Sequence, residues 1–138
     1  MAESKNLIEV KDMKIHFQQK GGKVVKAVDG ITFSIRKGET FGIVGESGCG
    51  KSTLGRGILR LIEPTEGKVF YNGRDMSTMS DKEMKELRQK IQIIFQDPSA
   101  CLNPRRTMKQ ILMEPFRVHG IKDKEFVENR IRELVELV

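Results

Sequence analysis

The sequence predicts an α/β fold with a phosphate-binding loop at its centre, and three consecutive segments carry this prediction. Residues 40–44 form a short apolar run, as expected of a strand buried on both faces. A glycine-rich segment, residues 45–53, follows directly. Beyond it, apolar residues recur at the spacing of one helix face: Leu54, Ile58, Leu61 and Ile62. Pro64 is expected to end that helix.

The glycine-rich segment matches the pattern G-x-x-x-x-G-K-[ST], which cradles phosphates. It comprises Gly45, Glu46, Ser47, Gly48, Cys49, Gly50, Lys51, Ser52 and Thr53. Its glycines allow positive φ, so backbone N–H groups can turn toward an anion, which the start of the following helix also favours. Lys51 is predicted to reach the β- and γ-phosphates, and the Ser52 hydroxyl to bind Mg²⁺. We therefore expect a nucleotide phosphate site; a glycine-rich turn without a ligand is the alternative.

The composition suits a globular chain, with 138 residues, 38% of them hydrophobic and 32% charged. The net charge of +6 raises the possibility of nucleic-acid binding. However, the 25 basic residues are interleaved with 19 acidic ones, so a surface facing anionic lipid headgroups or an acidic partner is an equally good interpretation. Cys49 and Cys101 lack C-x-x-C spacing, which indicates neither zinc nor a disulfide framework. No segment resembles a signal peptide or a membrane span.

Antiparallel strands are predicted before the loop, and a further short strand is predicted after its helix. Residues 7–17, 27–35 and 67–71 are the candidates, and in the second of these Ile31, Phe33 and Ile35 alternate with polar residues. Three dipeptides predict the connecting turns: Gly21-Gly22, Lys37-Gly38 and Asn72-Gly73. His16 is expected at the surface of the first strand, without a carboxylate partner visible in the sequence.

The second half of the chain reads as mainly helical. A capping box at Ser80 and Glu83 predicts a helix over residues 81–89. Residues 91–95 are a second candidate for a buried strand, which ends at Gln96. A helix over residues 108–118 is expected to kink or stop early at Pro115 and to end at His119-Gly120. A final apolar stripe runs at helical spacing to Val138 without a capping signal, so we expect the chain to be the N-terminal part of a longer protein.

Three segments together resemble the ATPase subunits of ABC transporters, and more narrowly the ATP-binding subunits of dipeptide and oligopeptide importers. They are Lys26-Ala27-Val28-Asp29-Gly30-Ile31-Thr32-Phe33, the glycine loop, and Phe95-Gln96-Asp97-Pro98-Ser99-Ala100-Cys101-Leu102-Asn103-Pro104-Arg105. The resemblance covers residues 7–138. It implies a P-loop NTPase core of the ABC ATPase type with an N-terminal antiparallel β subdomain. Residues 1–96 would form this region, and residues 97–138 would begin a helical subdomain.

The resemblance also implies ligands and partners. Gln96 matches the family's Q-loop glutamine, which reaches Mg²⁺ and the attacking water and links the nucleotide to the membrane subunits. ATP and Mg²⁺ are the implied cofactors, and residues 97–106 are the implied contact surface. The implied partners are transmembrane permease subunits, a second ABC ATPase subunit and, indirectly, a peptide-binding protein, at the cytoplasmic face of the cell membrane. No nucleic acid is expected.

The sequence departs from the family pattern in two respects. The usual adenine-stacking aromatic position is occupied by Gly22, and Phe17 is the nearest aromatic candidate. The Walker B strand with its catalytic glutamate, the signature motif and the switch histidine are not in this sequence. We therefore expect this chain alone to bind nucleotide without hydrolysing it, and missing central strands to leave apolar surface exposed. A non-hydrolysing nucleotide-binding module is the main alternative function, and a basic nucleic-acid-binding protein is a weaker one.

Overall fold

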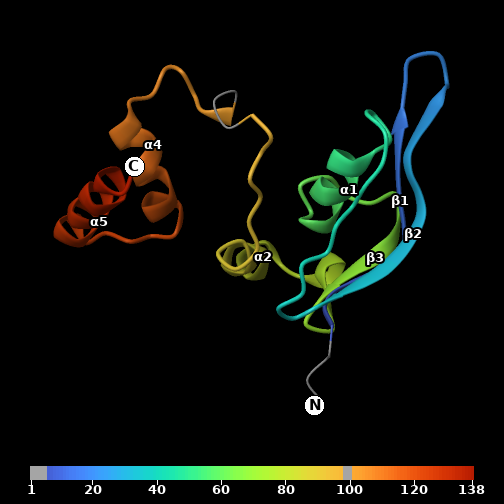
Figure 1. The fold of residues 1–138 in the computed structure, drawn as a ribbon, viewed down its shortest axis with the longest axis horizontal. Coiled ribbons are helices and arrows are strands. Elements are labelled where there is room, and N and C mark those ends of the chain that lie inside the picture. The colour runs from blue at the N-terminus through green and yellow to red at the C-terminus, as the bar shows by residue number, and fades with distance from the viewer. Residues whose placement is uncertain (1–5, 98–100) are drawn as a thin grey trace. The chain divides into compact units, whose positions relative to one another are not determined.

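The computed structural model describes residues 6–97 and 101–138, which form two compact units divided after Gln92. Among the elements that lie wholly within the described residues, the first unit contains the strands, the glycine loop and two α-helices, and the second contains a pair of helices (Figure 1). The domain boundary predicted after Gln96 lies slightly beyond this division and stays a prediction. No helix in the described ranges is both long and apolar enough to cross a membrane.

The sheet of the first unit has four antiparallel strands in the order β2-β1-β3-β4. Their bounds are Asn6–Gln18 for β1, Val24–Arg36 for β2, Glu66–Tyr71 for β3 and Arg74–Asp75 for β4. The predicted strands before and after the loop are therefore confirmed. The Asn72-Gly73 turn is confirmed as well. Both residues have positive φ, 46° and 76°, as a two-residue hairpin with a type I′ turn requires.

A bulge keeps the apolar face of β1 on the core. Val10 pairs with Phe33 and Met13 with Ile31, so β1 has one residue more than β2 between these two pairs. Asp12 lies at this irregularity with φ 45°, and its N–H donates to the Thr32 hydroxyl at 2.9 Å. Without the extra residue the alternation would turn Asp12 inward, because side chains in a strand alternate with a period of two.

Helix α1 (Lys51–Ile58) packs on the sheet and completes the core of the first unit (Figure 1). The most deeply buried side chains of the core are Val10, Met13, Ile15 and Met76. Gly57 allows a close approach, since a Cβ there would lie 2.5 Å from Ile15 Cδ1. The loop at the start of α1 is therefore anchored to β1 through the helix that follows it.

The prediction that Pro64 ends this helix is wrong, because α1 already stops at Ile58. Arg60 takes the left-handed conformation with φ 52°, and the Leu61 N–H donates to the Arg56 carbonyl at 2.8 Å, as in a Schellman motif. The Arg60 guanidinium then donates to the carbonyls of Met76 and Met79, at 2.9 and 3.2 Å. These bonds explain why an arginine occupies a position where glycine is usual.

The two predicted buried strands are wrong, because neither residues 40–44 nor residues 91–95 form strands. Val44 is 96% exposed and Ile94 is 93% exposed. A strand of a parallel sheet needs hydrogen-bonding neighbours, and within the described residues no strand pairs with either segment. The predicted antiparallel strands are thus observed, and the two predicted buried strands are not. The expected exposure of apolar surface is observed as well.

Each of the remaining α-helices begins at a capping residue, of which Ser80 was predicted from the sequence. α2 (Asp81–Leu87) starts at a capping box of Ser80 and Glu83, and the short 3₁₀ helix η1 (Met76–Thr78) precedes it. In the second unit, α4 (Met108–Val118) starts at Thr107 and α5 (Lys124–Glu136) at Asp123. Of the kink or early stop predicted at Pro115, the early stop is wrong, since α4 continues to Val118, and the kink stays a prediction. Helix α4 ends at His119 and Gly120, where the Ile121 N–H donates to the Phe116 carbonyl at 2.9 Å.

Candidate functional site

The glycine loop curls around the side chain of Lys51. Gly48 and Gly50 have φ values of 78° and 95°, which only glycine adopts without strain. The Lys51 ammonium donates to the carbonyl oxygens of Gly45 at 2.8 Å and Glu46 at 2.5 Å. The chain thus holds a positive charge within the turn that the motif predicts for phosphate.

A cavity of about 330 Å³ opens beside this loop. Six of the nine predicted loop residues line it: Gly48, Cys49, Gly50, Lys51, Ser52 and Thr53. Gly45, Glu46 and Ser47 are not among the lining residues, and the first two act as acceptors for Lys51 instead. Their binding roles stay a prediction.

The start of α1 supplies hydrogen-bond donors to the cavity. The first hydrogen bond inside the helix runs from the Leu54 N–H to the Gly50 carbonyl at 2.8 Å. The N–H groups of Lys51, Ser52 and Thr53 belong to the first turn, where backbone donors have no acceptor within the helix. No acidic residue stands in this turn, and no carboxylate is among the described residues that line the cavity. The site therefore suits an anion.

The opposite wall of the cavity consists of Val25, Lys26 and Ala27 at the beginning of β2, and the sequence did not predict it. The loop touches this wall closely, because a Cβ on Gly50 would lie 2.1 Å from the Ala27 carbonyl oxygen. Phe17 pairs with Val25 across the two strands, which places a ring beside the wall. Motif spacing within the loop carries no information about a contact between residues this far apart in the chain.

His16 has a carboxylate partner, which was not visible in the sequence. Its Nε2 donates to Asp29 Oδ1 at 2.9 Å, and its side chain is only 16% exposed. The hydrogen bond with His16, followed by the one with Lys26, lowers the pKa of Asp29 from its ordinary value. The pairing depends on the register of β1 and β2, which single-strand periodicity does not reveal.

Gln96 belongs to the second unit, where it lies outside regular secondary structure with an exposed side chain. Its predicted role at Mg²⁺ and the attacking water stays a prediction. Of the predicted contact segment 97–106, residues 98–100 lie outside the described residues.

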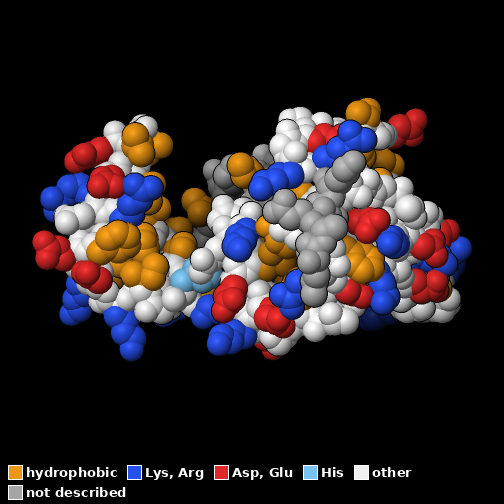
Figure 2. All heavy atoms as spheres, turned by 90° about the horizontal axis from the view of Figure 1, so that it is seen from below, with side chains coloured by type: hydrophobic (Ala, Val, Ile, Leu, Met, Phe, Trp, Pro, Cys, Tyr) orange, Lys and Arg blue, Asp and Glu red, His pale blue; other side chains and the backbone are white. Residues whose placement is uncertain are grey.

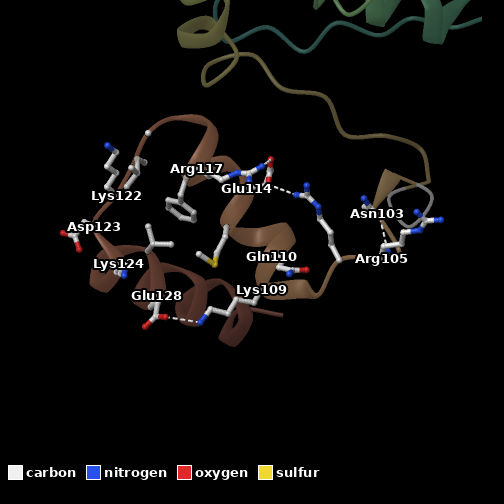
Figure 3. A pocket seen from close by; sticks show the side chains of 16 residues that line it. Asn103, Arg105, Lys109, Gln110, Glu114, Arg117, Lys122, Asp123, Lys124 and Glu128 are labelled. Atoms are coloured by element: carbon white, nitrogen blue, oxygen red, sulfur yellow. Dashed lines mark hydrogen bonds and ion pairs between the residues drawn. The ribbon is translucent and has the colours of Figure 1, made fainter.

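The second unit has a groove of about 990 Å³ between α4, α5 and the segment before α4 (Figure 3). Apolar side chains contribute to its lining: Met113, Phe116, Ile121 and Val127. Figure 2 shows hydrophobic side chains on the surface of this unit, surrounded by charged ones. We call the groove between α4, α5 and the segment before α4 the helical groove.

The acidic side chains around the helical groove already have partners. Glu114 accepts hydrogen bonds from Arg106 and Arg117, each at 2.6 Å, and both lower the pKa of its carboxyl group. Glu128 accepts from Lys109 at 3.0 Å. In contrast, the side chains of Arg105 and Lys122 form no hydrogen bond or ion pair with any described residue. These two side chains lie at opposite ends of the view in Figure 3. The rim therefore carries unpaired positive charge.

Comparison with known proteins identifies the family. Residues 28–137 match the sequence family described as ABC transporter. This chain belongs to the ABC transporter family. The resemblance inferred from the loop and the Gln96 segment is therefore confirmed at the level of the family.

Two relatives of this ABC transporter chain have names that include a transported substrate. The oligopeptide transport ATP-binding protein AppF of Bacillus subtilis is 46% identical over an alignment of 144 positions, gaps included, that covers 99% of this chain and 44% of AppF. The oligopeptide transport ATP-binding protein OppF of Salmonella typhimurium is 45% identical over an alignment of 140 positions, gaps included, that covers 95% of this chain and 42% of OppF. The chain thus spans less than half the length of these relatives.

Solved structures confirm the ABC ATPase type of the fold. The dimeric ABC transporter cassette MJ0796 superimposes with a TM-score of 0.78 at 28% identity, covering 94% of this chain and 56% of the cassette. A second structure of MJ0796, in a post-hydrolysis state bound to ADP and Pi, gives a TM-score of 0.76 with the same coverage and identity. The antiparallel sheet, the loop and the helices described above are therefore part of an ABC cassette.

Proposed function

We propose that this chain is the nucleotide-binding part of an ATP-binding subunit that couples ATP binding and hydrolysis to oligopeptide import. The observation that carries the proposal is the cavity at the glycine loop, in which Lys51 and the first turn of α1 face the start of β2. The names of AppF and OppF supply the transported substrate, an oligopeptide.

The residues of the cavity suit the phosphates of ATP. The Lys51 ammonium would exchange its carbonyl acceptors for the β- and γ-phosphates, since an ionised acceptor makes the stronger hydrogen bond. The first-turn N–H groups of α1 would bind phosphate oxygens. The Ser52 hydroxyl, a hard oxygen ligand at the cavity, fits Mg²⁺, which when bound neutralises charge on the phosphates. Gln96 would supply a second oxygen ligand and orient the attacking water.

Phe17 is our candidate for stacking on the adenine. Its cross-strand partner Val25 lines the cavity, and Phe17 is 41% exposed, so its ring is accessible to a base. Directly paired residues point to the same face of a sheet, which places the ring on the side of the phosphate loop. Replacement of Phe17 by alanine should weaken ATP binding while leaving the binding of inorganic triphosphate unchanged.

Hydrolysis requires more than the lining of this cavity. A general base or another water-positioning group is needed beside the γ-phosphate, and none of the described lining residues carries a carboxylate. This observation favours, as a second candidate, a module that binds ATP without cleaving it by itself. Magnesium-dependent ATP binding by the purified chain without phosphate release would support this second candidate.

The helical groove is our candidate contact for a transmembrane permease subunit. Its apolar floor and the unpaired charges of Arg105 and Lys122 are complementary to an amphipathic cytoplasmic segment that carries carboxylates. This contact would place the chain at the cytoplasmic face of the cell membrane, together with a second ATPase subunit and, indirectly, a peptide-binding protein. Reversal of charge in Arg105→Glu should weaken assembly with the permease without changing ATP affinity.

The proposed function is tested by replacement of Lys51. We expect Lys51→Ala to weaken Mg·ATP binding by about tenfold to a hundredfold, since a charge-assisted contact to phosphate contributes about 1.5–3 kcal/mol. Lys82→Ala, which removes an exposed lysine of α2, is the matched control and should bind ATP like the wild type. Unchanged ATP affinity in Lys51→Ala would refute the proposal. Salt-sensitive RNA binding that persists in this variant would instead favour the nucleic-acid hypothesis.

A further inference from the structure

The wall of the phosphate cavity contains a β-bulge. Ile15 pairs with Val28, and the next residue of β1, His16, pairs with Lys26. Ala27 is therefore an extra residue on β2 without a partner on β1. A bulge of this kind bends its strand and redirects the backbone locally. Here the redirected backbone lines the cavity.

Three polar side chains bracket this bulge. Asp29 accepts from His16 Nε2 at 2.9 Å and from Lys26 Nζ at 3.2 Å, one bond to each carboxylate oxygen. Lys26 and Asp29 lie on either side of the bulge in β2, whereas His16 reaches across from β1. The His16 side chain is largely shielded from water, which strengthens its bond relative to a fully exposed pair. The three side chains together hold the two flanks of the bulge at a fixed separation.

The bulge in turn contacts the phosphate loop. The Ala27 carbonyl faces Gly50 so closely that even a methyl group would not fit between them. Gly50 is the N-cap of α1, and its carbonyl accepts the first hydrogen bond of that helix. A shift of Ala27 would therefore move the N–H groups that begin α1.

We propose that His16, Lys26 and Asp29 form a positioning cluster for the phosphate loop, which fixes the Ala27 bulge against Gly50. None of the three needs to contact the nucleotide. The cluster acts through backbone geometry, because displacement of donors at a site of this kind weakens every contact they make. The affinity readout below rests on the proposed function, whereas the spectroscopic readout does not.

A neighbouring ion pair offers a matched control. Lys14 Nζ donates to Glu66 Oε2 at 2.7 Å and links β1 to β3 rather than to β2. The two groups shift each other's pKa, since that of Lys14 is raised and that of Glu66 lowered by their hydrogen bond. Neither residue lines the phosphate cavity. Glu66→Gln therefore removes a similar charge pair without touching the bulge.

The test compares Asp29→Asn with Glu66→Gln. We expect Asp29→Asn to weaken binding of a fluorescent ATP analogue about threefold to tenfold, the effect of losing one or two modest hydrogen bonds. It should also shift the amide resonance of Gly50 in the nucleotide-free protein. Glu66→Gln should change neither quantity. His16→Gln retains one hydrogen-bond donor. Its affinity for the ATP analogue and its Gly50 amide shift should therefore be intermediate between those of Asp29→Asn and the wild type.

The results for Asp29→Asn and Glu66→Gln either support the positioning cluster or overturn it. An unshifted Gly50 resonance in Asp29→Asn would overturn it, and so would equal effects of Asp29→Asn and Glu66→Gln on affinity. If the wild-type chain binds no ATP, the proposed function fails, but the Gly50 resonance still decides whether the cluster positions the loop. Thermal denaturation of each variant shows whether a loss of affinity follows from unfolding.

Discussion

Replacement of Gly50 by alanine should abolish most ATP binding. The added Cβ would lie 2.1 Å from the Ala27 carbonyl oxygen, whereas real Cβ contacts essentially never fall below 3.0 Å. The loop and β2 must therefore separate by about 0.9 Å, the difference between these two distances. A displacement of about 1 Å at a geometrically matched site can cost about a hundredfold, so we expect a loss of that order in Mg·ATP affinity.

Gly48→Ala separates this clash from backbone strain. Gly48 also has positive φ, 78°, but a Cβ there meets open space. We expect only the strain of a left-handed residue, about 1 kcal/mol, and a loss of affinity below about tenfold. Isothermal titration calorimetry with Mg·ATP measures both variants, and circular dichroism melting curves check that each is folded. Wild-type affinity in Gly50→Ala, or an equal loss in Gly48→Ala, would refute the argument from close approach.

Three further predictions concern the stability of the fold and the accessibility of a cysteine. Gly57→Ala should lower the free energy of unfolding in urea by about 1–3 kcal/mol, because the new methyl group crowds a buried isoleucine of β1. A methyl group at Gly55 meets open space, so Gly55→Ala should raise the free energy of unfolding by about 0.5–1 kcal/mol. Hydrogen bonds from Arg74 and from the N–H and hydroxyl of Ser80 lower the pKa of Glu83 from 4.5 to about 2. The stability due to its ionised form is therefore complete above pH 4.5 and is lost as the pH falls toward 2. In Glu83→Gln the melting temperature should depend less on pH over this window. A pH dependence like that of the wild type would contradict the contribution assigned to Glu83. ATP should slow alkylation of Cys49 but not of Cys101, as mass spectrometry can show; equal protection of both thiols would argue against binding at the loop.

Local signals in the sequence predicted the elements whose structure is determined locally. The Asn72-Gly73 hairpin and the capping box at Ser80 form as expected, because each depends on a few consecutive residues. The phosphate loop belongs to this group, since its glycines and Lys51 act within one turn. These features need no information about distant segments.

The incorrect predictions involve contacts between distant residues. An apolar run such as residues 40–44 predicts a buried strand only if other strands pair with it, and the described sheet offers no neighbour. The end of α1 depends on the bonds from Arg60 to η1, which replace the expected stop at Pro64. Similarly, the wall of the cavity at Ala27 and the bond between His16 and Asp29 arise from the pairing of β1 with β2.

A crystal structure of the chain with Mg²⁺ and a non-hydrolysable ATP analogue tests the central claim most directly. We predict that the triphosphate lies in the cavity between β2 and the start of α1, with the Lys51 ammonium on its β- and γ-phosphates and the Ser52 hydroxyl on Mg²⁺. A triphosphate bound elsewhere, or a Lys51 that keeps its bonds to Gly45 and Glu46 and makes none to phosphate, would contradict the account.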